Sequence, residues 1–268
     1  MRRGDSAAVE PSRVPSSARA QVQAKKKKKI PETDAIFDQI HLVNARADAS
    51  EHQLRISVDA KAAVKVGQLS RNGLTRKLVE ALDHDFAPDA VVVPVGILVP
   101  KTGELWIDIV KSPVTADAIA DVVEGWWHAT RPRFPGIDWL LVDQDNGPEN
   151  NSHRTQFMAR MVKFADTARL HVELAYYPPY HSKYNPIERC WAALEHYWNG
   201  DLLDSLDAVA GFASNMTWKG MHPVVQFVQR VYTKGVTLAD AAMREVEARL
   251  KRHPTLGRWF VNIDFTPP

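Results

Sequence analysis

Four acidic residues occupy positions from which they could bind the same metal ions. Asp59 ends an alternating segment at 54–60, and Asp143 and Asp145 follow the apolar run "IDWLL". Glu188 lies within "HSKYNPIERCW". Acids just beyond the ends of neighbouring strands can converge, because open sheets place their sites there. Carboxylates without cysteine or suitably spaced histidine favour Mg²⁺ or Mn²⁺. Two such ions about 3.5–4 Å apart would support phosphoryl transfer.

Each acid also has a purely structural explanation. An Asp at the end of a strand commonly forms a turn, and Asp143 and Asp145 precede an Asn-Gly-Pro sequence. For Glu188 the alternative is a capping box, with Asn185 as the N-cap, Pro186 at the first helical position and Glu188 at the third. The spacing of the acids alone therefore leaves catalysis and local structure open.

The composition limits the class of protein. The chain has 268 residues and is 45% hydrophobic, which is enough for one sizeable core. No apolar run approaches the roughly 20 residues of a membrane span, and the first residues lack the apolar region of a secretory signal. Cys190 is the single cysteine, which excludes disulfide frameworks and cysteine-rich zinc sites. We therefore expect a cytoplasmic protein with no membrane partner.

Positive charge is concentrated at the start of the chain. Residues 1–29 contain nine Lys and Arg but only two acids, so the remainder has 25 cations and 30 anions. The composition of residues 1–31 predicts a disordered basic arm. Its run of five lysines, Lys25 to Lys29, is either a solvated tail or a non-specific phosphate-binding segment, and the two are compatible. The mildly acidic body suits a site that gathers carboxylates around metal ions.

The order of predicted elements indicates the fold class. A helix over 32–48 is followed by strands at 54–60, 63–69, 90–99 and 104–110, which suggest an antiparallel meander. Helices and strands then alternate: a helix capped by Thr115, a central strand at 137–143, a helix capped by Ser152, a strand at 171–177 and a helix from Pro186 to Asn199. Helices are expected at 204–216, 222–233 and 238–252, before a final strand or loop, "RWFVNIDF". This order fits an α/β or α+β sheet flanked by helices.

The combination of motifs is more specific than its parts. An Asp ends the first strand, "DNGPEN" follows the central strand, and "PPYHSKYNPIERCWAALEHYWNG" follows the last one. Over residues 32–268 this pattern resembles the DDE (Asp-Asp-Glu) transposases of bacterial insertion sequences, in particular the Rhodopirellula-type group. The resemblance implies an RNase H-like mixed sheet flanked by helices. Residues 32–200 would form the catalytic domain, and residues 201–268 a helical extension packed on the core.

The resemblance also implies the chemistry. Asp59, Asp145 and Glu188 would be the catalytic acids and would bind two Mg²⁺ or Mn²⁺ ions, with Asp143 as the competing choice for the second acid. The reaction would be DNA strand cleavage followed by strand transfer. The partners would be the element ends and target DNA, bound at the nucleoid by a homodimer or higher oligomer.

Basic residues near these acids are candidate DNA contacts. Lys61, His181, Lys183 and Arg189 could bind phosphates near the scissile bond, although ordinary solvation is the alternative for each. The segment "SRNGLTRK" at 70–77 is more simply a solvated hairpin than part of a DNA groove, and "DHDF" at 83–86 is expected to be a loop. Trp191 is expected to lie on the side of its helix that packs into the hydrophobic core.

One feature departs from the family pattern. The basic arm leaves no room for the N-terminal helix-turn-helix region that reads the ends of the element. We therefore expect the catalytic part alone, from a truncated copy. The alternatives are a non-catalytic DNA-binding remnant and a structural RNase H-like module.

Overall fold

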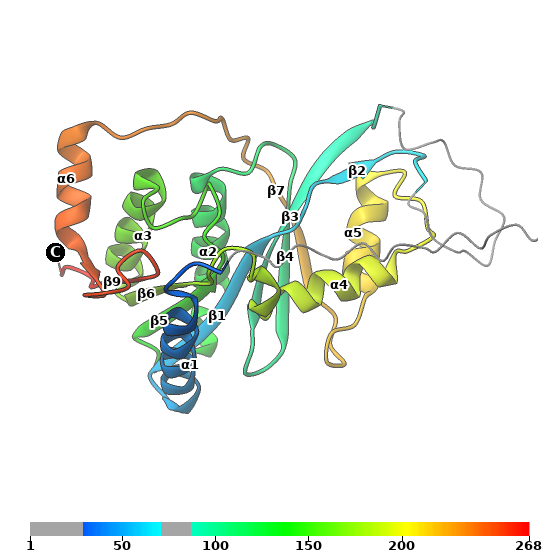
Figure 1. Ribbon diagram of the computed structural model, residues 1–268. Helices are drawn as coiled ribbons and strands as arrows, with labels where there is room; N and C mark the ends of the chain where they lie inside the picture. Colours follow the sequence, from blue (N-terminus) through cyan, green and yellow to red (C-terminus); the bar gives the residue numbers. More distant parts are fainter. Residues whose placement is uncertain (1–28, 71–86, 268) are drawn as a thin grey trace, which may run out of the picture.

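A single mixed sheet organises residues 29–70 and 87–267, the part of the chain that the computed structural model describes (Figure 1). Its strands are β1 (Gln53–Ala60), β2 (Val64–Val66), β3 (Ala90–Val99), β4 (Glu104–Val110), β5 (Trp139–Gln144), β6 (His171–Tyr176), β7 (Val224–Val228), β8 (Leu250–Arg252) and β9 (Phe260–Ile263). Their order is β7-β4-β3-β1-β5-β6-β9-β8, with β2 paired to β3. The predictions for residues 1–28, for the segment "SRNGLTRK" beyond Ser70 and for 83–86 lie outside the described residues.

Helices cover both faces of this sheet. They are α1 (Thr33–Ala49), α2 (Ala116–Thr130), α3 (Thr155–Ala168), α4 (Glu188–Tyr197), α5 (Leu206–Asn215) and α6 (Asp240–Arg249), with short 3-10 turns at Arg131–Arg133 and Ser182–Tyr184. None of the helices in this part of the chain is long and apolar enough to cross a membrane.

Strand β1 is the centre of the sheet. It pairs antiparallel with β3 on one side and parallel with β5 on the other. The parallel pairing of β1 and β5 ends at Val58 and Gln144. Because parallel strands point the same way, their carboxyl ends meet at one edge of the sheet. Asp59 and Asp145 each come one residue after this last pair, so the backbone alone brings them to the same edge.

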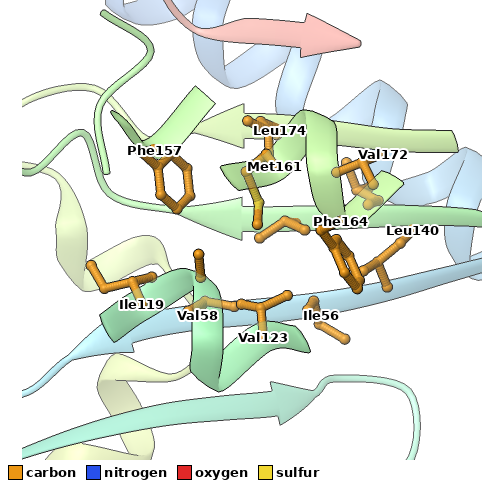
Figure 2. Close-up of a cluster of buried hydrophobic side chains, with 14 of the residues drawn as sticks. Ile56, Val58, Ile119, Val123, Leu140, Phe157, Met161, Phe164, Val172 and Leu174 are labelled. Carbon is orange, nitrogen blue, oxygen red and sulfur yellow. The ribbon is translucent and has the colours of Figure 1, made fainter. Parts of the chain in front are cut away.

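The alternation of side chains along β1 separates two packing layers. Ile56 and Val58 point into a cluster with α2 and α3, and Figure 2 shows Val123 and Phe164 of these helices beside the strands. Full burial of each such side chain stabilises the fold by about 1.5–3 kcal/mol. Ser57 lies on the opposite face, where it meets the segment that leads into α4. The site is therefore built on the less apolar face of the central strand.

Most of the predicted elements are confirmed. The Thr115 hydroxyl caps α2 by accepting a hydrogen bond from Ala118 N at 3.3 Å. The prediction that Ser152 caps the next helix is wrong, because its hydroxyl donates to the Arg258 carbonyl at 2.8 Å and α3 begins at Thr155. The Ser152 hydroxyl binds a partner about a hundred residues away instead of the backbone of the next helix.

The C-terminal part of the chain is less helical than predicted. Helices α5 and α6 form within two of the expected ranges. The helix expected over 222–233 is wrong, because Val224–Val228 forms β7, parallel to β4 at the edge of the sheet. Strands β8 and β9 extend the other edge through pairing of β9 with β6. The β-branched residues of β7 are stabilised in a strand by pairing with β4. The spacing of apolar residues along the sequence does not reveal that neighbouring strand.

Candidate active site

The segment before α4 is bonded directly to the central strand. The Ser57 hydroxyl donates to Asn185 Oδ1, and Asn185 Nδ2 donates to the Val58 carbonyl at 3.1 Å. The backbone N–H of Ile187 in turn donates to Ser57 Oγ at 3.1 Å. Asn185 is only 1% exposed, so these bonds form away from competing water. These bonds hold Glu188, the residue after Ile187, beside the end of β1.

This arrangement replaces the predicted capping box. Helix α4 begins at Glu188 and its N-cap position is Ile187, without a side-chain cap. Asn185 instead accepts the Glu188 N–H with its backbone carbonyl, at 3.1 Å, while its side chain binds β1. The prediction of Asn185 as N-cap and Glu188 as the third helical residue is therefore wrong. Glu188 has no capping role in this structure.

Three of the predicted acids share one electrostatic environment. Burial raises the pKa of Asp59 to about 8, and the carboxylates of Asp145 and Glu188 raise it in the same direction. Burial also raises the pKa of Asp145 above its usual value. Like charges oppose one another's ionisation only when they are close. The ends of β1 and β5 and the start of α4 therefore bring Asp59, Asp145 and Glu188 together.

Hydrogen bonds orient Asp59 within this group. Trp191 Nε1 donates to Asp59 Oδ2 at 2.8 Å, and the Ala60 N–H also favours the ionised form. The Trp191 ring lies over Gly96, the residue paired with Asp59 on β3. A Cβ atom at position 96 would come within 2.5 Å of that ring. Trp191 is buried as predicted, but its bond to Asp59 was not foreseen from the spacing of apolar residues.

The loop after β5 orients Asp145. Asn150 is 5% exposed and donates through Nδ2 to Gln144 Oε1 at 2.9 Å and to the Asp145 carbonyl at 3.2 Å. The same nitrogen lies 3.5 Å from Asp145 Oδ1. A Cβ atom at Gly147 would lie 2.9 Å from Asn150 Oδ1, so a side chain at this position would displace Asn150. Gln144 and Asn150 were not identified from the sequence, although both lie in the polar run "DQDNGPEN".

Asp143 is placed differently from Asp145. It is fully buried, pairs in register with Ser57, and lies 3.2 Å from Arg55 Nη1. Burial raises its pKa to about 7, although the Arg55 guanidinium acts in the opposite direction. Arg55 also binds Asp48 of α1 at 2.7 Å. Asp143 thus belongs to an ion-paired contact between α1 and the sheet, and Asp145 lies with Asp59.

A cavity of about 200 Å³ opens beside the acids. Its walls include Asp59, Asp145, Glu149 and Asn150. Glu188 is not in its wall and influences Asp59 through its charge. Glu149 is a further carboxylate that the sequence reasoning did not identify. This all-oxygen set of donors fits Mg²⁺ or Mn²⁺.

The acids do not form a closed coordination shell as they stand. Over residues 29–70 and 87–267, no three His, Cys, Asp or Glu side chains are arranged to hold a metal ion. Burial raises the pKa of Asp59 and the carboxylates of Asp145 and Glu188 add to the rise, whereas a bound divalent cation would favour the ionised carboxylate. The donor chemistry of these residues, carboxylates without cysteine or histidine, therefore fits a divalent cation.

The predicted DNA contacts divide into two groups. The Lys61 ammonium forms an ion pair with Glu195 and lies 5.7 Å from the centre of the Trp198 ring, with 7% of its side chain exposed. In this structure the Lys61 ammonium is thus held against α4, and its contact with DNA stays a prediction. Lys183 and Arg189 are exposed, and His181 is half-buried, with Nδ1 2.8 Å from the Pro179 carbonyl. These three remain predicted DNA contacts.

The strand order and the acids define the class of protein. The order β4-β3-β1-β5-β6, with an antiparallel meander and two strands parallel to β1, is an RNase H-like fold with carboxylates at the ends of β1 and β5. The chain belongs to the family described as the Rhodopirellula transposase DDE domain, which it matches over residues 14–265. Both the family and the fold class predicted from the sequence are confirmed.

One solved structure supports the same fold, and a second is reported beside it. The Mos1 transposase paired-end complex with left transposon end matches with a TM-score of 0.50 and 13% identity, over 74% of this chain and 58% of that chain. The Mos1 mariner paired end complex with Mn matches with a TM-score of 0.49 and 13% identity, over 73% and 58% of the two chains. The chain thus spans 58% of the length of the Mos1 chains. A comparison with curated proteins finds no match.

Proposed function

We propose that this protein catalyses metal-dependent cleavage of DNA strands and their transfer to target DNA during movement of an insertion sequence. The observation that carries the proposal is the convergence of Asp59, Asp145 and Glu188: burial raises the pKa of Asp59, and the charges of Asp145 and Glu188 raise it further. Membership of the DDE transposase family supports the same activity. An activity on element ends and target DNA would take place at the nucleoid.

Each acid has a support suited to this reaction. All three acids would bind the metal ions. The carboxylate of Asp59 is held by Trp191, and that of Asp145 is oriented by Asn150. Glu188 follows the segment that Asn185 bonds to β1. Once bound, two Mg²⁺ or Mn²⁺ ions would activate water and then the freed 3′-hydroxyl, and stabilise the leaving oxygen. Rigid supports of this kind keep ligands in a productive geometry.

DNA is the proposed partner. Lys183 and Arg189, exposed on either side of Glu188 in the chain, would contact phosphates near the scissile bond. Such contacts fix the register of the nucleic acid without reading its sequence. A homodimer or higher oligomer on DNA would bring two element ends together.

The test is nicking of supercoiled plasmid DNA by the purified chain with Mn²⁺. We expect nicked product from the wild type and none from Asp59→Asn. With pre-cut ends and a target plasmid, joined products would show strand transfer. A wild type that binds DNA and does not nick it would support the alternative, a non-catalytic remnant of a transposase.

A further inference from the structure

Aromatic rings gather in the turn that leads to Glu188. The Phe37 ring of α1 lies 5.5 Å from the His181 ring and 5.0 Å from the Tyr184 ring, edge-on to both. The His181 and Tyr184 rings are 6.0 Å apart and nearly parallel, at 24°. We call residues 180–184, together with Phe37, the aromatic turn. Its internal contacts give it a defined shape beside the active site.

Two tyrosines of the aromatic turn face the solvent. Tyr180 is 66% exposed and Tyr184 is 51% exposed. Tyr180 also has a φ of +65°, a left-handed conformation that is unfavourable for a residue with a side chain. Strained backbone that holds a side chain in a set position occurs most often at ligand-binding sites. The exposure and the strain at Tyr180 are separate observations that both indicate a ligand.

Two cations accompany the tyrosines. Lys183 Nζ lies 5.1 Å from the centre of the Tyr184 ring, and Arg189 is exposed in the first turn of α4. Residues 177–184 contain no acid. Exposed aromatic rings interleaved with cations are typical of surfaces that bind unpaired nucleotides, because bases stack on the rings while phosphates meet the cations.

The aromatic turn is also fixed relative to the acids. Tyr184 directly precedes Asn185, whose side chain is bonded to Val58 and Ser57. The Asn185 N–H donates to the Ser182 carbonyl at 2.7 Å, which closes the turn. A nucleotide bound on Tyr180 would therefore lie at a constant offset from Asp59 and Glu188.

We propose that the aromatic turn binds an unpaired nucleobase of the DNA strand that enters the active site. Tyr180 stacks on the base, and Lys183 and Arg189 contact the flanking phosphates. The substrate class is thus DNA with an unpaired nucleotide close to the scissile phosphate. This inference rests on the proposed function for the identity of the nucleic acid, and its test does not require cleavage.

The test compares two DNAs that carry the fluorescent base 2-aminopurine: a duplex with a short single-stranded overhang, and the same sequence fully paired. Binding is measured with Ca²⁺ as a non-catalytic ion. Stacking on Tyr180 should quench 2-aminopurine in the overhang. In Tyr180→Ala we expect the quench to disappear and overhang binding to weaken about tenfold. Binding of the paired duplex should stay unchanged.

Two control variants separate stacking from general effects. Tyr180→Phe keeps the ring and should behave as wild type. Tyr197→Ala removes another exposed tyrosine, 43% exposed at the end of α4, and should also leave both DNAs unaffected. An unchanged quench in Tyr180→Ala would overturn the proposal, as would equal weakening on both DNAs. A changed sedimentation coefficient of DNA-free Tyr180→Ala would instead assign the turn to a protein interface and overturn it too.

The outcome is independent of the nicking assay. If Asp59→Asn abolishes nicking while Tyr180→Ala retains the quench, the active site stands and the aromatic turn has no role in stacking. If the wild type does not nick DNA and the quench still depends on Tyr180, the proposed function fails and the nucleotide site stands.

Discussion

The indole of Trp191 and the carboxylate of Asp59 are joined by a hydrogen bond of 2.8 Å between Nε1 and Oδ2. This bond links α4, which begins with Glu188, to β1, which carries Asp59. Gly96 makes the contact possible, because any side chain there would collide with the indole ring. The first and third acids are therefore positioned relative to each other by one tryptophan as well as by the Asn185 contacts.

Loss of this hydrogen bond should reduce activity more than stability. Trp191→Phe keeps an aromatic ring over Gly96 but removes the donor to Asp59. A hydrogen bond to a charged group contributes about 1.5–3 kcal/mol, so we expect nicking to fall at least tenfold. Trp198→Phe is the matched control, since Trp198 Nε1 donates at 2.8 Å to Glu195 on the same helix. Equal nicking rates for the two variants would contradict a positioning role for Trp191.

The pH dependence of stability should report the raised pKa of Asp59. This pKa is about 8 in the folded chain against 3.8 for an ordinary Asp. Between these values the folded state keeps a proton that the unfolded state has released. The free energy of unfolding should therefore fall as pH rises from about 4 to 8, by up to about 1.4 kcal/mol per pH unit from this group. Urea unfolding without divalent cations measures the effect.

Asp59→Asn should remove that contribution and leave a shallower dependence on pH. Asp143, with a pKa of about 7, and Asp108, with a pKa of about 6, act in the same direction in both proteins. The difference between the wild-type and Asp59→Asn curves is therefore the quantity to compare. Mn²⁺ should restore stability near pH 8 in the wild type and much less in the variant. Parallel curves would argue against a raised pKa at Asp59.

Substitutions of Asp143 and Asp145 should have different effects: that of Asp143 on stability and that of Asp145 on activity. Asp143→Ala leaves Arg55 without one of its two carboxylate partners in a buried position, and we expect a loss of about 2 kcal/mol in the free energy of unfolding. Its nicking should stay within severalfold of wild type at a temperature where it is folded. Asp145→Asn should keep or raise stability and abolish nicking. The opposite pair of results would assign the second acid to Asp143.

Glu188 and Glu149 compete for the role of third acid. Glu188 has no capping function at the start of α4, so Glu188→Gln should not cost helix stability. Removal of a like charge near Asp59 should even raise stability without metal. We expect nicking by Glu188→Gln to fall by orders of magnitude.

Glu149→Gln is the control for Glu188→Gln, because Glu149 lines the cavity with Asp59, whereas Glu188 raises the pKa of Asp59 by its charge. Nicking by Glu149→Gln should stay within severalfold of wild type. A severe loss in this variant together with a mild one in Glu188→Gln would exchange their roles. Thermal unfolding of both proteins checks that they are folded.

The sequence by itself determined the local features of this protein. Alternation of apolar residues predicted β1, the content of β-branched and aromatic residues predicted β3 and β4, and the Thr115 hydroxyl marked the start of α2. These features depend on neighbours within a few residues, whose spacing is visible in the chain. The Asp that ends the first strand, "DNGPEN" and "NPIERCW" each lie in one continuous segment, so together they indicated the family and the three candidate acids without knowledge of packing.

Only the tertiary structure decided which side chains meet over long separations. Asp143 and Asp145 are two residues apart, and they differ because pairing with β1 ends between them, after Gln144. Lys61 pairs with Glu195, and Asn185 binds β1 rather than capping α4. Each of these partners lies more than a hundred residues away, and a polar side chain that becomes buried must take whatever partner the packing provides. The spacing of residues along the chain therefore does not predict these partners.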